Sequence, residues 1–192
     1  MLETPAPYFE DLWASSVDPW DHAGRWYETR KYDLTVGALP SRRYRHALEP
    51  ACGVGLVTAR LATRADAVSA SDRFAGAVVA TTARCAELPH VDVRLGDLRD
   101  GPPPRLAPFD LVVLGEVLYY FDATTVADVI RRWHGACEPG GHVALVHHRP
   151  AVAEHVLDGD GVHTVARDVL GRPVVEVVDA LFRIDVFTAP DA

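Results

Sequence analysis

The chain has 192 residues and a formal net charge of −8, with 48% hydrophobic and 24% charged side chains. This length suits one domain with a full core and is too short for two of ordinary size. The composition is typical of a soluble globular protein, and the acidic balance argues against a nucleic-acid partner, which needs a basic surface.

The predicted elements begin with an aromatic and charged segment, residues 1–40. We expect one or two helices there, interrupted at Asp18-Pro19, because the residue before a proline avoids the helical region. We interpret this segment as a helical extension, or lid, on a main domain that covers residues 41–192. The first 21 residues contain several acids and no apolar core segment, so no signal peptide is predicted.

From residue 44 onward, apolar strands alternate with helices. Strands are expected at 45–50, 67–71, 91–95, 109–114 and 142–147, helices at 56–64, 74–85 and 123–136, and a proline-rich loop at 101–108. This alternation predicts a parallel sheet with helices on both faces. The runs 174–178 and 182–187 are too close together for a helix between them, so they should form an antiparallel hairpin. The fold class is therefore α/β, with a seven-stranded, mostly parallel sheet and an antiparallel last strand.

A glycine-bearing turn follows the first strand, in the run Leu48-Glu-Pro-Ala-Cys-Gly-Val-Gly-Leu-Val-Thr58. Gly53 and Gly55 allow the chain to turn tightly against a ligand, and the next helix points its free N–H groups at that ligand. Asp72, about 20 residues after Gly53, ends the next strand where such sheets hold a ribose diol. This combination predicts an adenosine-containing cofactor. The alternatives are a plain turn with two glycines, and an Asp72 that only caps the following helix.

The same turn disfavours a dinucleotide. Thr58 stands where the pyrophosphate fingerprint has a third small residue, and Glu49 would place a negative charge near any phosphate. A cofactor with cationic groups and no phosphate fits better, and S-adenosylmethionine carries both a sulfonium and an ammonium.

Further motifs extend this pattern in order along the chain. They are Glu49-Pro-Ala-Cys-Gly-Val-Gly55, Asp72, Gly96-Asp97, the run Phe109 to Tyr120, and Glu138-Pro-Gly-Gly141. Over residues 18–187 the chain resembles the class I S-adenosylmethionine-dependent methyltransferases. Within that class, Asp18-Pro-Trp20, Tyr27-Glu-Thr-Arg-Lys-Tyr32, Ala47-Leu-Glu49 and Glu116-Val-Leu-Tyr-Tyr120 resemble the nodulation methyltransferase NodS family, whose acceptor is the free amine of a chitooligosaccharide. The resemblance implies a Rossmann-like domain, S-adenosylmethionine as cofactor and S-adenosylhomocysteine as product.

The resemblance also implies roles for individual residues. Gly53 and Gly55 approach the methionine and ribose, Asp72 accepts the ribose hydroxyls, and Asp97 accepts the adenine amino hydrogen beside Leu98. The implied cofactor site further includes Trp20, Lys31, Glu49, Ala51, Arg73, Glu116, Val117 and Tyr120. Ala51 departs from the pattern, since most members have a glycine there. The tail from His148 onward resembles NodS poorly, so the acceptor's identity does not carry over.

Several of these residues have ordinary structural alternatives. Lys31, the single lysine, either pairs with the cofactor's carboxylate or lies on a solvated helix face. Trp20 covers the site or is core, and Asp97 is an adenine ligand or a turn acid. Glu116 interrupts an otherwise apolar strand and needs a partner; it either holds an amine, with Tyr119 and Tyr120 as walls, or caps a loop.

The nine histidines raise the question of a metal site, which the sequence disfavours. His147 and His148 are adjacent on a strand and point to opposite faces, and the loop at 158–161 is too short for a calcium motif. One of His147 and His148 should lie over the site, and the other should lie in a helix layer. His163 is expected to cap the substrate side. With Glu116, these three histidines are the candidate catalytic residues.

The resulting prediction is methyl transfer to a small polar acceptor. An amine, such as an amino sugar, is favoured because it needs to lose only one proton, whereas an alcohol needs a stronger base or a metal. O-methylation of a small natural product, a nicotinamide-dependent oxidoreductase on the same sheet, and a non-catalytic module that only binds the cofactor stay open. Three scattered cysteines favour a cytoplasmic location, and no apolar run is long enough to span a bilayer, so no membrane partner is expected. A monomer or homodimer is expected.

Overall fold

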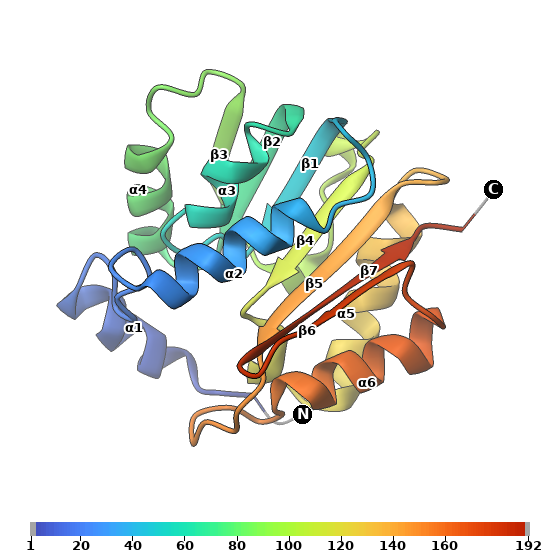
Figure 1. The fold of residues 1–192 in the computed structure, drawn as a ribbon. Helices are drawn as coiled ribbons and strands as arrows, with labels where there is room; N and C mark the ends of the chain where they lie inside the picture. The colour runs from blue at the N-terminus through green and yellow to red at the C-terminus, as the bar shows by residue number, and fades with distance from the viewer. Residues whose placement is uncertain (1–2, 191–192) are drawn as a thin grey trace.

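A seven-stranded sheet in the order β3-β2-β1-β4-β5-β7-β6 runs through the centre of the molecule (Figure 1). The structure is a computed structural model that describes residues 3–190. The strands are β1 (Tyr44–Pro50), β2 (Ala65–Asp72), β3 (Val91–Leu95), β4 (Leu111–Gly115), β5 (His142–His148), β6 (Val175–Val178) and β7 (Phe182–Thr188). β1 to β5 pair in parallel, and β7 is antiparallel to both β5 and β6. The predicted mostly parallel sheet with a hairpin ending is confirmed.

Helices cover both faces of this sheet. α2 (Trp26–Gly37), α3 (Leu56–Leu61) and α4 (Ala75–Arg84) lie on one face, and α5 (Ala123–Ala136) and α6 (Gly159–Leu170) lie on the other (Figure 1). β4 shows why its sequence is wholly apolar: Leu111 and Val113 pack with the α2 and α3 side, whereas Val112 and Leu114 pack with α5 and α6. A central parallel strand buried on both faces has no polar alternation.

The first 40 residues form two helices, α1 (Ala6–Ser15) and α2, and the predicted interruption at Asp18-Pro19 falls between them. α2 is an integral part of the main core, because Tyr32 and Val36 pack against the sheet with α3. α1 contacts α4 and lies outside the two helix layers.

α6 (Gly159–Leu170) was not predicted from the sequence. Asp158 begins this helix by accepting a hydrogen bond from the Gly161 backbone N–H at 2.7 Å. Two glycines in the first turn have poor helix propensity, so the apolar residues Val162 and Ala166 were not recognised as one face of a helix. Among residues 3–190, no helix combines the length and apolar character needed to cross a membrane.

Candidate active site

A cavity of about 570 Å³ opens at the carboxyl ends of the parallel strands, beneath α1 and the start of α2. This volume lies in the range of small-molecule sites. Of the residues expected at a site, the cavity is lined by Trp20, Glu49, Ala51, Gly53, Asp72, Arg73, Leu98, Glu116, Val117, Tyr119, Tyr120 and His148. Lys31, Gly55, Asp97, His147 and His163 do not line it.

The turn after β1 has the left-handed backbone that its glycines predict, with φ of +61° at Ala51, +54° at Gly53 and +75° at Gly55. A Cβ on Gly55 would lie 2.9 Å from Thr81 Cγ2, so packing requires glycine there. A Cβ on Gly53 would meet no protein atom within 4 Å, and Gly53 lines the cavity. The space beside Gly53 is therefore free for a ligand. Ala51 adopts the same backbone region at a cost of about 1–2 kcal/mol.

Asp72 fastens this turn to the end of β2. The Gly53 backbone N–H donates to Asp72 Oδ2 at 3.1 Å, and the Phe74 N–H donates to Oδ1 at 3.0 Å. A carboxylate has about four acceptor positions, so Asp72 keeps capacity for two hydroxyls of a ligand. The geometry suits a ribose diol at the cavity wall.

Glu49 is buried beneath the same turn and accepts a hydrogen bond from the Thr58 hydroxyl. Burial raises the pKa of Glu49 to about 8, and the nearby Asp72 adds to this shift. Glu49 therefore holds a proton at neutral pH until a positive charge comes close. A cofactor with an ammonium or sulfonium group matches this carboxyl, whereas a phosphate does not.

Glu116 follows β4 with a left-handed backbone, φ +53°, and belongs to a buried charged cluster. Lys31 Nζ lies 2.7 Å from Glu116 Oε1 and 2.6 Å from Glu28 Oε2, and the lysine is 1% exposed. The rings of Tyr27 and Tyr32 lie 4.9 Å from the same ammonium. Lys31 is thus neither a solvated residue nor a cavity residue.

The two acidic residues of this cluster, Glu28 and Glu116, both line the cavity. Glu116 Oε2 accepts from the Tyr119 hydroxyl at 2.6 Å and from the His148 backbone N–H at 3.2 Å. Burial by itself would raise the pKa of Glu116, but Lys31, followed by His147 and the Tyr119 hydroxyl, outweighs burial and lowers that pKa to about 2. With two carboxylates and one ammonium, the cluster presents a net negative charge to a ligand.

Asp97 is engaged away from the main cavity. Its Oδ1 accepts from the Arg99 backbone N–H at 2.9 Å, and its Oδ2 accepts from Arg99 Nη2 at 2.6 Å. It lines a smaller neighbouring cavity of about 220 Å³, which shares Gly96 with the main one. These contacts are those expected of an acid that stabilises a turn. Asp97 could contact an adenine only by sharing its oxygens with Arg99.

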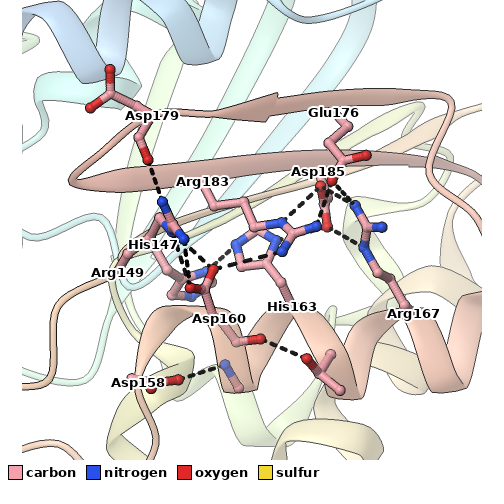
Figure 2. A network of polar contacts seen from close by, with 12 residues as sticks. His147, Arg149, Asp158, Asp160, His163, Arg167, Glu176, Asp179, Arg183 and Asp185 are labelled. Carbon is pink, nitrogen blue, oxygen red and sulfur yellow. Dashed lines mark hydrogen bonds and ion pairs between the residues drawn. The ribbon is translucent and has the colours of Figure 1, made fainter.

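The candidate histidines separate into two groups. His148 lines the cavity, whereas His147 points into the α6 layer, as alternation along a strand requires. His163 does not cap the substrate side; it is fully buried between α6 and the hairpin, with Nδ1 3.0 Å from Asp185 Oδ2 (Figure 2). Asp185 also binds Arg167 (Figure 2). None of His163, Arg167 and Asp185 lines the cavity. The helix that carries His163 was not predicted, which is why its position was wrong.

Several cavity residues were not among the expected site residues. They are Tyr8 and Phe9 from α1, His22 before α2, Tyr27 and Glu28 in the first turn of α2, and His155 before α6. Tyr27 and Glu28 belong to the motif Tyr27-Glu-Thr-Arg-Lys-Tyr32, but no site role was predicted for them. His22 stacks on Trp20 with ring centroids 5.6 Å apart, and His155 stacks on Tyr119 at 3.7 Å. The aromatic density of the first 40 residues was the one available signal. Among residues 3–190, no group of three or more His, Cys, Asp or Glu side chains is placed to hold a metal ion.

Residues 47–141 match the family described as a methyltransferase domain. A crystal structure assigned to a methyltransferase from Pseudomonas syringae shares 33% identity with this chain, with a TM-score of 0.75, over 85% of this chain and 99% of that one. The chain belongs to the methyltransferase family. Its sheet order, glycine turn and acidic strand end are those of the class I, S-adenosylmethionine-dependent members.

Two further relatives of this methyltransferase carry the NodS name. Nodulation protein S of Sinorhizobium fredii is 27% identical over 133 residues, which are 68% of this chain and 61% of that protein. The chain thus matches less than two thirds of that relative's length. The structure of the N-methyltransferase NodS from Bradyrhizobium japonicum, in complex with S-adenosylhomocysteine, is 24% identical, with a TM-score of 0.81 over 96% and 98% of the two chains. At that identity the likeness shows the fold.

Proposed function

We propose that this methyltransferase transfers a methyl group from S-adenosylmethionine to the amine nitrogen of a small polar acceptor, such as an amino sugar. The supporting observation is the charged cluster of Glu28, Lys31 and Glu116, which turns a net negative charge toward an aromatic-walled cavity. Such a cavity favours cationic ligands through ion pairing and cation–π contacts. The structural neighbour from Bradyrhizobium japonicum is an N-methyltransferase, which supports this proposal.

The cofactor half of the cavity is the part around the turn after β1. Gly53 leaves room for the ligand, Asp72 accepts its hydroxyls, and Glu49 meets its positive charge. When bound, S-adenosylmethionine supplies a methyl group on positively charged sulfur, so the leaving group is a neutral thioether. The protein's tasks are therefore to align the acceptor with that methyl and to exclude water.

The acceptor half lies under α1 and α2. Aromatic residues close it, with Phe9 packed against Tyr120 at 4.8 Å between ring centroids and His155 stacked on Tyr119. Glu116 and Glu28 attract an ammonium, and a base must then remove one proton before the nitrogen can react. The nicotinamide alternative is set aside because the chain belongs to the methyltransferase family. A cytoplasmic location, a monomeric or homodimeric state and the role of residues 1–40 as a lid stay predictions.

The test compares amines with matched alcohols. The purified protein is incubated with S-adenosylmethionine and either glucosamine or glucose, and S-adenosylhomocysteine and methylated products are measured by mass spectrometry. We expect product with glucosamine or other small primary amines, and a large rise in KM for the amine in Glu28→Gln. Turnover of the alcohols alone would overturn N-methylation.

A further inference from the structure

Two hydrogen bonds at the cavity wall determine which nitrogen of His148 carries a proton. The Tyr27 hydroxyl lies 3.1 Å from the Leu181 carbonyl oxygen and 3.0 Å from His148 Nδ1. A carbonyl only accepts, and a phenol has one hydrogen, so the hydroxyl donates to Leu181. His148 Nδ1 must therefore carry the hydrogen and donate it to Tyr27. The other nitrogen, Nε2, is left with a free lone pair.

His147 and His163 are poor candidates for the base, because each of their ring nitrogens already has a polar neighbour. The Leu118 backbone N–H donates to His147 Nε2 at 3.4 Å, so His147 Nδ1 carries the hydrogen and donates to His163 Nε2 at 3.3 Å. His163 Nδ1 then carries the hydrogen of its ring, and it lies 3.0 Å from Asp185 Oδ2 (Figure 2). Burial lowers the pKa of both histidines, which agrees with two neutral rings in a chain. His147 thereby binds the backbone N–H of Leu118, the residue before Tyr119.

We propose that His148 is the general base of the methyl transfer and that Tyr27 is its positioning residue. The inference rests on the proposed function, because it concerns the same site and an amine acceptor. His148 Nε2 removes a proton from the acceptor's ammonium and so exposes the nitrogen lone pair. That nitrogen forms a bond to the methyl carbon as the carbon–sulfur bond breaks, and the electron pair of the broken bond stays on sulfur. The proton then passes from His148 to water.

The surroundings of His148 suit this role. Its backbone N–H donates to Glu116 Oε2 at 3.2 Å, so the base lies at the end of β5 beside the carboxylate at the end of β4. An ionised Glu116 stabilises the ammonium before transfer of the proton and the imidazolium after it. The titratable groups around His148 are Tyr27 from α2, which contacts the ring, Glu116 after β4, which accepts from the His148 backbone N–H, and His155 from the segment before α6.

His155 is the rival base, since it also lines the cavity. Its Nδ1 is buried without a hydrogen-bond partner among the described residues, and its ring stacks on Tyr119. No hydrogen bond within residues 3–190 fixes its tautomer, whereas the Tyr27 hydroxyl fixes that of His148. A base held by a third group is the arrangement on which efficient proton transfer depends.

The first experiment needs no acceptor. In protein with ¹⁵N-labelled histidine and bound S-adenosylhomocysteine, long-range ¹H–¹⁵N correlation spectra report the protonated nitrogen of each ring. The signal lost in His148→Gln identifies His148. We expect a proton on Nδ1 and a free Nε2 in the wild type, and a mixture of tautomers in Tyr27→Phe. A proton fixed on Nε2 of His148 would overturn the inference, whatever the protein's activity.

The second experiment measures kinetics with glucosamine. We expect His148→Gln to lower kcat by about 10²- to 10⁴-fold with little change in the Kd for S-adenosylhomocysteine. Tyr27→Phe should lower kcat less and displace the acid limb of the pH–rate profile. His134→Gln is the matched control, because its Nε2 contacts the Thr188 carbonyl on the protein surface. A wild-type kcat in His148→Gln would overturn the base and leave the proposed function standing. Failure of the wild type to methylate any amine would overturn both.

Discussion

Replacing Lys31 with methionine tests the charged cluster behind the cavity. The substitution keeps the length of the side chain and removes the ammonium that lies 2.7 Å from Glu116 and 2.6 Å from Glu28. Removing one partner from a buried ion pair lowers the free energy of unfolding by about 3–5 kcal/mol. The pKa of Glu116 falls from 4.5 to about 2, because Lys31, His147 and the Tyr119 hydroxyl together outweigh the effect of burial. At about 1.4 kcal/mol per pKa unit, this net shift corresponds to roughly 3 kcal/mol shared among those groups.

The assay is urea unfolding at neutral pH for Lys31→Met, Glu116→Gln and the double variant. The double variant should recover part of the loss, because no ionised Glu116 is then left beside an apolar side chain. Arg43→Met is the control: Arg43 pairs with Asp66 on the exposed surface, where such pairs contribute less than about 1 kcal/mol. A Lys31→Met loss no larger than that of Arg43→Met would refute the reasoning. Since the pKa of Glu116 is lowered, its contribution is present above pH 4.5 and lost as the pH falls toward 2.

Three further predictions concern the turn after β1. Ala51→Gly should raise the free energy of unfolding by about 0.5–1 kcal/mol, because relief of the left-handed strain exceeds the added entropy of the unfolded chain; a lower melting temperature would contradict this. Because the pKa of Glu49 is raised from 4.5 to about 8, the ligand-free protein should lose stability as pH rises through that window, by up to about 1.4 kcal/mol per pH unit, and Glu49→Gln should flatten the slope in thermal unfolding scans. Gly53→Ala should weaken S-adenosylhomocysteine binding more than it lowers stability, whereas Gly55→Ala should unfold the protein more easily because its Cβ meets Thr81; equal effects on both properties would argue against a ligand beside Gly53.

The fold was largely predictable because its signals are local in the chain. Continuous apolar runs such as 109–114 mark strands buried on two faces, and the short gap before Phe182 leaves room only for a hairpin. α6 escaped prediction because Gly159 and Gly161 weaken its first turn, while the cap that begins it depends on one hydrogen bond, which the Asp158 carboxylate accepts from the Gly161 backbone N–H.

The cofactor half of the candidate site was easier to predict from the sequence than the acceptor half, again because its signals are local in the chain. The cofactor half is built from one turn and the ends of neighbouring strands, so Gly53 and Asp72 could be chosen from spacing alone. The acceptor half joins residues far apart in the chain. Tyr27 and His148 are separated by 121 positions, and neither segment contains a pattern that predicts their contact. Lys31 stood out as the single lysine, but its burial between two carboxylates depends on how α2 packs.

Calorimetric titration of the purified protein with S-adenosylhomocysteine and, separately, with NADH tests the central claim most directly. The account predicts saturable binding of S-adenosylhomocysteine at one site per chain, weakened in Gly53→Ala, and no saturable binding of NADH. Saturable binding of NADH with no heat from S-adenosylhomocysteine or S-adenosylmethionine would contradict it.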